Sequence, residues 1–229
     1  QKLLKWKEAS LRKPLVLRGA RQVGKTYILT EFAKREYKDY IYVNFDENPS
    51  FASFFKENLD PERIIKELSL YFKKTIYPGL TLIVLDEIQE CPQALACLKY
   101  FCERKNEYHL ATAGSLLGVK LTKGFPVGKV NFLDLSPLNF FEFLSAIGER
   151  ELAAMLGEKD DPKPISEIFH NKLVYLLKYY FIVGGMPEAV VTYLKTENLD
   201  QVRAVQKEIL DAYTLDFAKH APKDEVMKI

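Results

Sequence analysis

Residues 14–26 read PLVLRGARQVGKT, and this stretch decides the fold. The apolar run at 14–18 predicts a buried strand, and a loop bounded by glycines follows it directly. From Thr26 to Tyr37 apolar residues recur at the spacing of one helix face, which they occupy at Ile28, Leu29, Phe32 and Ala33. A strand, a glycine-bounded loop and a helix in this order are typical of the first turn of a parallel α/β sheet.

The loop matches the pattern G-x-x-x-x-G-K-[ST] at every fixed position. Its glycines let the backbone curl so that successive N–H groups point at phosphate oxygens, and the following helix adds its positive end. Lys25 brings a full charge to the β- and γ-phosphates, and the hydroxyl of Thr26 is a magnesium ligand. The loop therefore predicts a site for ATP with Mg²⁺. The predicted nucleotide-binding residues here are Gly19, Gln22, Val23, Gly24, Lys25, Thr26 and Tyr27.

A second motif stands 60 residues further on, where the apolar run 82–85 ends in Asp86 and Glu87. An acid that ends a buried parallel strand lies at the carboxyl edge of the sheet, beside the phosphates. Asp86 is accordingly predicted to hold the magnesium, and Glu87 to orient and deprotonate the attacking water. Ser115 ends a later strand. It either contacts the γ-phosphate or the attacking water, or caps the segment that follows it.

Strands and helices alternate as far as residue 135, which predicts a parallel sheet wound on both faces by helices. The other predicted strands are Tyr40–Phe45, Leu80–Leu85, Tyr108–Ala113 and Val130–Leu135, with helices at Pro61–Phe72 and after Pro92. After Pro137 only helices are predicted, at Asn139–Ile147, Ser166–Val183 and Leu199 to about Lys219. We therefore expect an ATP-binding α/β domain over 1–136 and a helical region over 137–229.

The ordered set of motifs resembles a group of bacterial and archaeal AAA-type ATPases with a helical lid and a nuclease-like C-terminal domain. The motifs are GARQVGKT (19–26), VNFDENP (43–49), IVLDEIQ (83–89), TAGS (112–115), LSPLNFFEFL (135–144) and GGMPEAV (184–190). The resemblance implies a P-loop NTPase sheet of strand order 5-1-4-3-2 and an all-helical lid. It also supports the roles given above, Ser115 as a sensor included. Through a G-x-P motif at 185–187, it implies that Pro187 packs on the nucleotide; the residues alone are equally consistent with a tight turn there.

The sequence departs from this group in two respects. Gly128-Lys129 stands where the resembling proteins have Gly-Arg before the fifth strand, and the C-terminal domain is absent. Because the chain has no initiator Met and stops without a closing signal, we expect both ends to have been cut. Residues 137–229 would then hold the lid and the start of a truncated C-terminal region.

Composition limits the partners and the compartment. A net charge of +2 in 229 residues gives no support for nucleic-acid binding, although lysines at 120, 123 and 129 leave it open. Three cysteines without a signal peptide predict reduced thiols in the cytoplasm, and no apolar run predicts a membrane span. ATP and ADP are the expected ligands, and a homo-oligomer is left open.

The predicted activity is hydrolysis of ATP to ADP and phosphate, in which Lys25, Glu87 and Ser115 take part. A slowly cycling nucleotide-dependent switch is the first alternative. A P-loop kinase is the second alternative. The Asp86-Glu87 pair weighs against it, because a kinase needs no water-activating acid there. A GTPase is disfavoured, because the stretch 171–174 (NKLV) lacks the final Asp of a guanine-reading NKxD motif.

Overall fold

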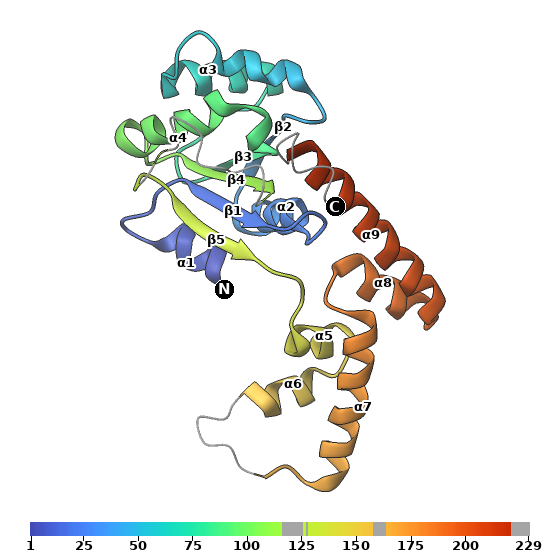
Figure 1. The fold of residues 1–229 in the computed structure, drawn as a ribbon. Helices are drawn as coiled ribbons and strands as arrows, with labels where there is room; N and C mark the ends of the chain where they lie inside the picture. Colours follow the sequence, from blue (N-terminus) through green and yellow to red (C-terminus); the bar gives the residue numbers. More distant parts are fainter. Residues whose placement is uncertain (116–125, 127, 158–163, 221–229) are drawn as a thin grey trace. The chain divides into compact units, whose positions relative to one another are not determined.

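The computed structural model describes residues 1–115, 126, 128–157 and 164–220, without the side chains of Ser115 and 216–220. The chain divides into two compact units (Figure 1). The first unit consists of Gln1–Ala20 and Gly24–Leu135, and the second of Arg21–Val23 and Ser136–Ile229.

The first unit is built on a parallel sheet of five strands in the order β2-β3-β4-β1-β5. This order confirms the predicted 5-1-4-3-2 arrangement. The strands are β1 (Leu15–Gly19), β2 (Asp39–Asn44), β3 (Thr81–Asp86), β4 (His109–Ser115) and β5 (Asn131–Leu135). Every residue of β3 is buried, as expected for a strand that is covered on both faces.

Alternation along the strands divides the core between the two faces of the sheet. Leu15 and Leu17 face a cluster with α1 (Lys2–Glu8) and α2 (Lys25–Glu36). Val16 faces the opposite cluster, to which α3 (Pro61–Phe72), α4 (Pro92–Arg104) and the 3₁₀ segment η1 (Pro49–Phe55) contribute. The predicted α/β architecture, wound on both faces, is therefore confirmed.

The edge strand β5 pairs with β1 along its whole length, from Leu15↔Asn131 to Gly19↔Leu135. A second link joins the same two strands. The Arg18 guanidinium donates to both carboxylate oxygens of Asp134, at 2.8 and 3.0 Å. The guanidinium also lies 4.2 Å from the centre of the Phe132 ring. Backbone and side chains thus both tie the strand before the phosphate loop to the last strand of the first unit.

From Ser136 onward, the regular elements of the second unit are all helices over its described part. Its helices are α5 (Phe140–Ala146), α6 (Arg150–Gly157), α7 (Glu167–Val183), α8 (Pro187–Thr196) and α9 (Leu199–His220). Consecutive residues of α5 enter two different apolar clusters. Phe143 packs with residues of α7, α8 and α9, and Leu144 packs with residues of α6 and α7. No single helix among the described residues is long and apolar enough to cross a bilayer, although the bent pair α7 and α8 passes that test together.

The turn between α7 and α8 is held against Leu138, in a contact that we call the Leu138 clasp. The N–H of Leu138 donates to the carbonyl of Gly185 at 2.7 Å, and Tyr180 Oη donates to the carbonyl of Leu138 at 2.8 Å. A Cβ atom on Gly185 would lie 2.0 Å from the Leu138 carbonyl oxygen. Only glycine fits at this position, which explains the second glycine of the GGMP sequence.

Candidate functional site

The predicted phosphate loop joins the end of β1 to the start of α2. Gly24 has φ of 92° and is the N-cap of α2, a conformation in which a glycine carries no steric cost. Its carbonyl accepts the first bond of the helix, from the N–H of Ile28 at 3.0 Å. The first turn of an α-helix directs its N–H groups toward the N-terminal end, and the helix dipole favours an anion there.

Lys25 is almost completely buried, with 7% of its surface exposed. Its ammonium group donates to the carbonyl oxygens of Gly19, at 3.1 Å, and Ala20, at 2.8 Å. A buried ammonium that is held by loop carbonyls places one positive charge inside the curl of the backbone. This is where the sequence predicts the β- and γ-phosphates.

The two motifs meet at a single carboxylate. Thr26 Oγ1 donates to Asp86 Oδ2 at 2.6 Å, and Asp86, the last residue of β3, is only 2% exposed. Its other oxygen, Oδ1, accepts the N–H of Glu87 at 3.0 Å.

A hydroxyl and a carboxylate side by side are the hard oxygen donors that Mg²⁺ prefers. The described residues contain no group of three or more His, Cys, Asp or Glu side chains that could hold a metal ion. Mg²⁺ is usually bound through one or two carboxylates and the phosphates of its substrate. Thr26 and Asp86 therefore fit the ion that the sequence predicts.

Two further residues of this site were not predicted from the sequence. Tyr42 Oη donates to Asp86 Oδ2 at 2.8 Å, and Asn44 Nδ2 donates to Tyr42 Oη at 3.3 Å. Burial, with the neighbouring Asp86 carboxylate, raises the pKa of Tyr42. The sequence does carry a signal for these two residues, because strand alternation places 42 and 44 on one face at the end of the strand that precedes β3. Without the pairing of β2 with β3, that face cannot be tied to Asp86.

Glu87 follows Asp86 in a left-handed conformation, with φ of 48°, and begins the 3₁₀ turn η2 (Ile88–Glu90). Its carboxylate accepts a hydrogen bond from the side-chain amide of Gln89. The other end of this amide, Gln89 Oε1, is buried without a hydrogen-bond partner among the described residues. An orphaned buried acceptor beside a carboxylate is compatible with a water or a polar ligand at this position.

The remaining predicted site residues lie at the end of β4, in the loop, on α2 and at the start of α8. Ser115 pairs with Gly19 in the β1–β4 register, so its backbone lies level with the start of the loop. Gln22 has φ of 62°, Val23 is buried, and Tyr27 on α2 is 69% exposed. Pro187 is the first residue of α8 in the second unit, after the turn of the Leu138 clasp. Their roles toward a nucleotide stay predictions.

Of the three lysines that left nucleic-acid binding open, Lys129 is within the described residues. Lys120 and Lys123 lie outside the described residues. Lys129 Nζ lies 2.9 Å from Glu103 Oε1 on α4, and this partner raises the pKa of Lys129. A lysine in a local ion pair gives no separate support for a nucleic-acid surface.

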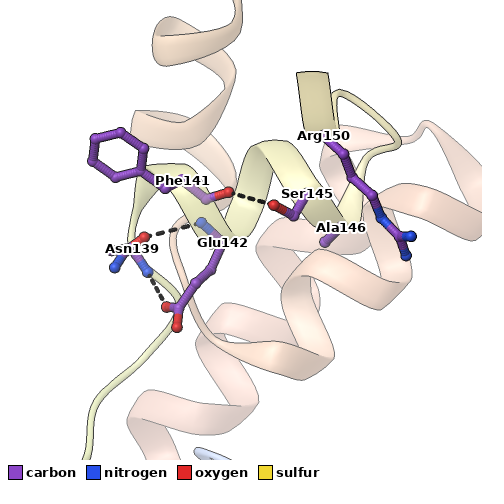
Figure 2. Close-up of a pocket in the computed structure, with 6 residues that line it drawn as sticks. All are labelled: Asn139, Phe141, Glu142, Ser145, Ala146 and Arg150. Carbon is purple, nitrogen blue, oxygen red and sulfur yellow. Dashed lines mark hydrogen bonds between the residues drawn. The ribbon is translucent and has the colours of Figure 1, made fainter. Parts of the chain in front are cut away.

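A separate pocket of about 480 Å³ lies in the second unit (Figure 2). Asn139 Oδ1 accepts the N–H of Glu142, and Glu142 Oε2 accepts the N–H of Asn139, both at 2.9 Å. Ser145 Oγ donates to the carbonyl of Phe141 at 2.9 Å. These polar groups serve the capping and backbone of α5 itself, so we assign the pocket no ligand.

Comparison with known proteins agrees with the geometry. A family model described as an AAA domain matches residues 11–144, and a model for a domain of unknown function (DUF8612) matches residues 174–229. No curated protein matches the chain. Among solved structures, the chain is similar to C. elegans PCH-2, with 13% sequence identity, a TM-score of 0.48 and coverage of 92% of this chain. The match covers 65% of the PCH-2 chain, so this chain spans less than two thirds of it. Because the AAA model matches more than half of the residues, the chain belongs to the AAA domain family, which confirms the predicted relationship to AAA-type P-loop ATPases.

Proposed function

We propose that the chain binds ATP together with Mg²⁺ at residues 19–26 and hydrolyses it to ADP and phosphate. The observation that carries this proposal is the 2.6 Å hydrogen bond from Thr26 to Asp86. It joins the two sequence motifs across 60 residues, and the residue before Thr26, Lys25, is almost completely buried. Membership of the AAA domain family supports nucleotide binding and hydrolysis in general.

In this proposal each residue has a distinct task. The backbone of residues 19–24 and the first turn of α2 surround the phosphates, while Lys25 offsets their charge. Thr26 and Asp86 hold Mg²⁺, which when bound neutralises charge that develops on the phosphate oxygens. Glu87 takes the proton of the attacking water, and Ser115 stands level with the loop, where it can contact the γ-phosphate or that water.

The test is the affinity for ATP of Lys25→Ala beside that of the wild type, measured by calorimetry in Mg²⁺. Loss of one charged donor to phosphate should weaken binding by on the order of 10- to 100-fold while the fold is retained. Lys34→Ala is a matched control, because Lys34 lies on the same helix but pairs with Glu31 at the surface. Unchanged affinity in Lys25→Ala would show that residues 19–26 are not the phosphate site.

A nucleotide-dependent switch that turns over rarely is the second candidate, and two contacts favour it. The carboxylate of Glu87 is engaged by Gln89. Lys129, at the position where the resembling proteins have Arg, is paired with Glu103. Steady-state phosphate release separates the two functions. Tight nucleotide binding with turnover slower than nucleotide exchange would identify a switch.

A further inference from the structure

The hydroxyl of Tyr42 contacts the site without belonging to either sequence motif. We propose that Tyr42 is a positioning residue, which holds the carboxylate of Asp86 in the orientation that receives Mg²⁺. This inference rests on the proposed function of Asp86 as the residue that holds the metal. It adds a strand, β2, to a site otherwise assigned to the loop 19–26 and the end of β3.

The register of the sheet explains how Tyr42 reaches Asp86. In the β2–β3 pairing Tyr42 lies opposite Val84 and Asn44 lies opposite Asp86. The side chain of Tyr42 therefore starts two residues before the strand end and extends toward the carboxyl edge, where its hydroxyl is 2.8 Å from Asp86 Oδ2. Because Asp86 is only 2% exposed, its carboxylate has little contact with water and protein donors must replace its hydration.

Asn44 determines the direction of this hydrogen bond. The Oδ1 atom of Asn44 accepts the N–H groups of Asp46, at 3.0 Å, and Glu47, at 3.1 Å. Oxygen accepts there, so the amide nitrogen must be the end that faces Tyr42, to which it donates. Because the Tyr42 oxygen already accepts from Asn44, its own proton is directed to Asp86. The relay thus runs from the 46–47 backbone through Asn44 and Tyr42 to the carboxylate.

The donors to Asp86 are not equivalent in the proposed mechanism. Thr26 donates to the same oxygen as Tyr42, but its hydroxyl oxygen is also a proposed magnesium ligand. The N–H of Glu87 holds the other oxygen and belongs to the adjacent peptide. Tyr42 is the donor to Oδ2 whose task is confined to Asp86, since its hydroxyl is hydrogen bonded only to Asp86 and Asn44 within the part of the chain that the structure describes. Removing its hydroxyl should therefore affect metal-dependent binding and leave direct phosphate contacts intact.

The experiment is calorimetric titration of a non-hydrolysable ATP analogue into wild type and Tyr42→Phe, with Mg²⁺ and separately with EDTA. With EDTA the two proteins should bind the analogue equally. With Mg²⁺ the variant should bind about tenfold more weakly, and it should need about tenfold more Mg²⁺ for half-maximal effect. Asn44→Ala, which removes the orienting donor and keeps the Tyr42 hydroxyl, should show a smaller loss of the same kind.

Two tyrosines provide controls. Tyr40→Phe changes the same strand and face, and the Tyr40 hydroxyl has no hydrogen bond to the part of the chain that the structure describes. Tyr37→Phe loses a hydrogen bond to His109. His109 is the first residue of β4, at the opposite end of that strand from Ser115. This variant therefore measures the effect of lost stability away from the site. Both should keep the Mg²⁺ dependence of the wild type.

The outcomes separate the inference from the proposed function. Wild-type Mg²⁺ dependence in Tyr42→Phe would overturn the positioning role and leave the proposed function standing. Equal weakening in Mg²⁺ and EDTA would also overturn it, because the hydroxyl would then support only the fold. If the wild type itself binds the analogue without any effect of Mg²⁺, the proposed metal site fails and the inference fails with it.

Discussion

At the scale of single residues, Glu87 is the proposed base. It lies next to the buried Asp86, and its carboxylate is held by Gln89. Glu87→Gln keeps the size and hydrogen bonding of the side chain but cannot take a proton. We expect ATP binding within about twofold of the wild type and turnover lower by on the order of 10² to 10⁴.

The measurement for Glu87→Gln is steady-state phosphate release, together with the calorimetric affinity for ATP. Glu90→Gln is the control, because Glu90 is an exposed acid in the same 3₁₀ turn. Unchanged turnover in Glu87→Gln would remove Glu87 from the role of base, whatever the affinity. If turnover falls in both variants, the negative charge of the turn is responsible and not the carboxylate of Glu87 alone.

His109 should make stability depend on pH. It is buried, its Nδ1 is hydrogen bonded to the Tyr37 hydroxyl at 2.7 Å, and burial with the nearby Arg12 and Lys7 lowers its pKa to about 4. The unfolded chain binds this proton at about pH 6.5, so the folded state binds fewer protons between these values. The contribution of His109 is therefore present above about pH 6.5 and is lost as the pH falls to about 4.

Thermal unfolding between pH 7 and 4 measures this effect as the difference between wild type and His109→Gln. The difference in unfolding free energy should shrink as the pH falls. His170→Gln, at an exposed position of α7, should follow the wild type throughout. Parallel curves for wild type and His109→Gln would contradict the assignment of this titration to His109.

At the scale of elements, the Leu138 clasp predicts a severe effect of one added methyl group. In Gly185→Ala the new Cβ would lie 2.0 Å from a backbone oxygen, which cannot yield as a flexible side chain can. We expect a destabilisation of roughly 1–3 kcal/mol in the second unit. Gly157→Ala, where nothing lies within 4 Å of the added carbon, is the matched control within the same unit.

Hydrogen exchange at α7 and α8, with thermal unfolding, measures the effect of Gly185→Ala. Faster exchange should appear around the turn that joins these two helices. If Gly185→Ala matches Gly157→Ala in both measurements, the clasp does not hold the turn in solution.

A helix or strand could be predicted from the sequence where its local pattern of apolar residues was strong. The strands were readable as short apolar runs, and α2, α3, α4, α5, α7 and α9 correspond to the predicted helices. The helix α8 was not predicted, because the turn residues before Pro187 concealed a helix that begins at this proline. The helix α6 and the segment η1 are short, and their positions depend on packing against α5 and α4.

Prediction of the candidate site was limited in the same way, because some of its contacts depend on tertiary structure. Lys25, Thr26, Asp86 and Glu87 were predictable because each stands at a fixed place in a motif. Tyr42, Asn44 and Gln89 were not, because their contacts depend on the register of β2 with β3 and on the left-handed turn at Glu87. Local motifs indicate the residues that are proposed to face the ligand, whereas tertiary pairing selects those that support them.

At the scale of the whole molecule, the sequence has Lys129 at the position before the fifth strand where the resembling proteins have an arginine. The segment 116–130 contains no Arg, and Lys129 is paired with Glu103. A lysine lacks the planar fork that contacts two phosphate oxygens, and an inserted arginine contributes on the order of 10³ to 10⁵ in rate. We therefore expect this chain alone to hydrolyse ATP slowly, with the missing group supplied by another subunit, domain or partner.

Turnover as a function of protein concentration tests this expectation in wild type, Lys129→Arg and Lys129→Ala. A rate per molecule that rises with concentration, increases in the Arg variant and disappears in the Ala variant would place Lys129 in a neighbouring subunit's site. Fast turnover at nanomolar concentration that is indifferent to both changes would contradict the prediction, because the site would then be complete within one chain.

The pairing of β1 with β5 has a mechanical consequence. Tension that pulls on residue 136 while the first unit is held at its amino end loads two adjacent parallel strands from opposite ends. The hydrogen bonds between them extend from Leu15↔Asn131 to Gly19↔Leu135 and lie across the direction of pull. All of these bonds therefore share the load, and they do not break one after another. The Arg18–Asp134 ion pair bears the same load. Under increasing tension the two strands would therefore separate in one abrupt step.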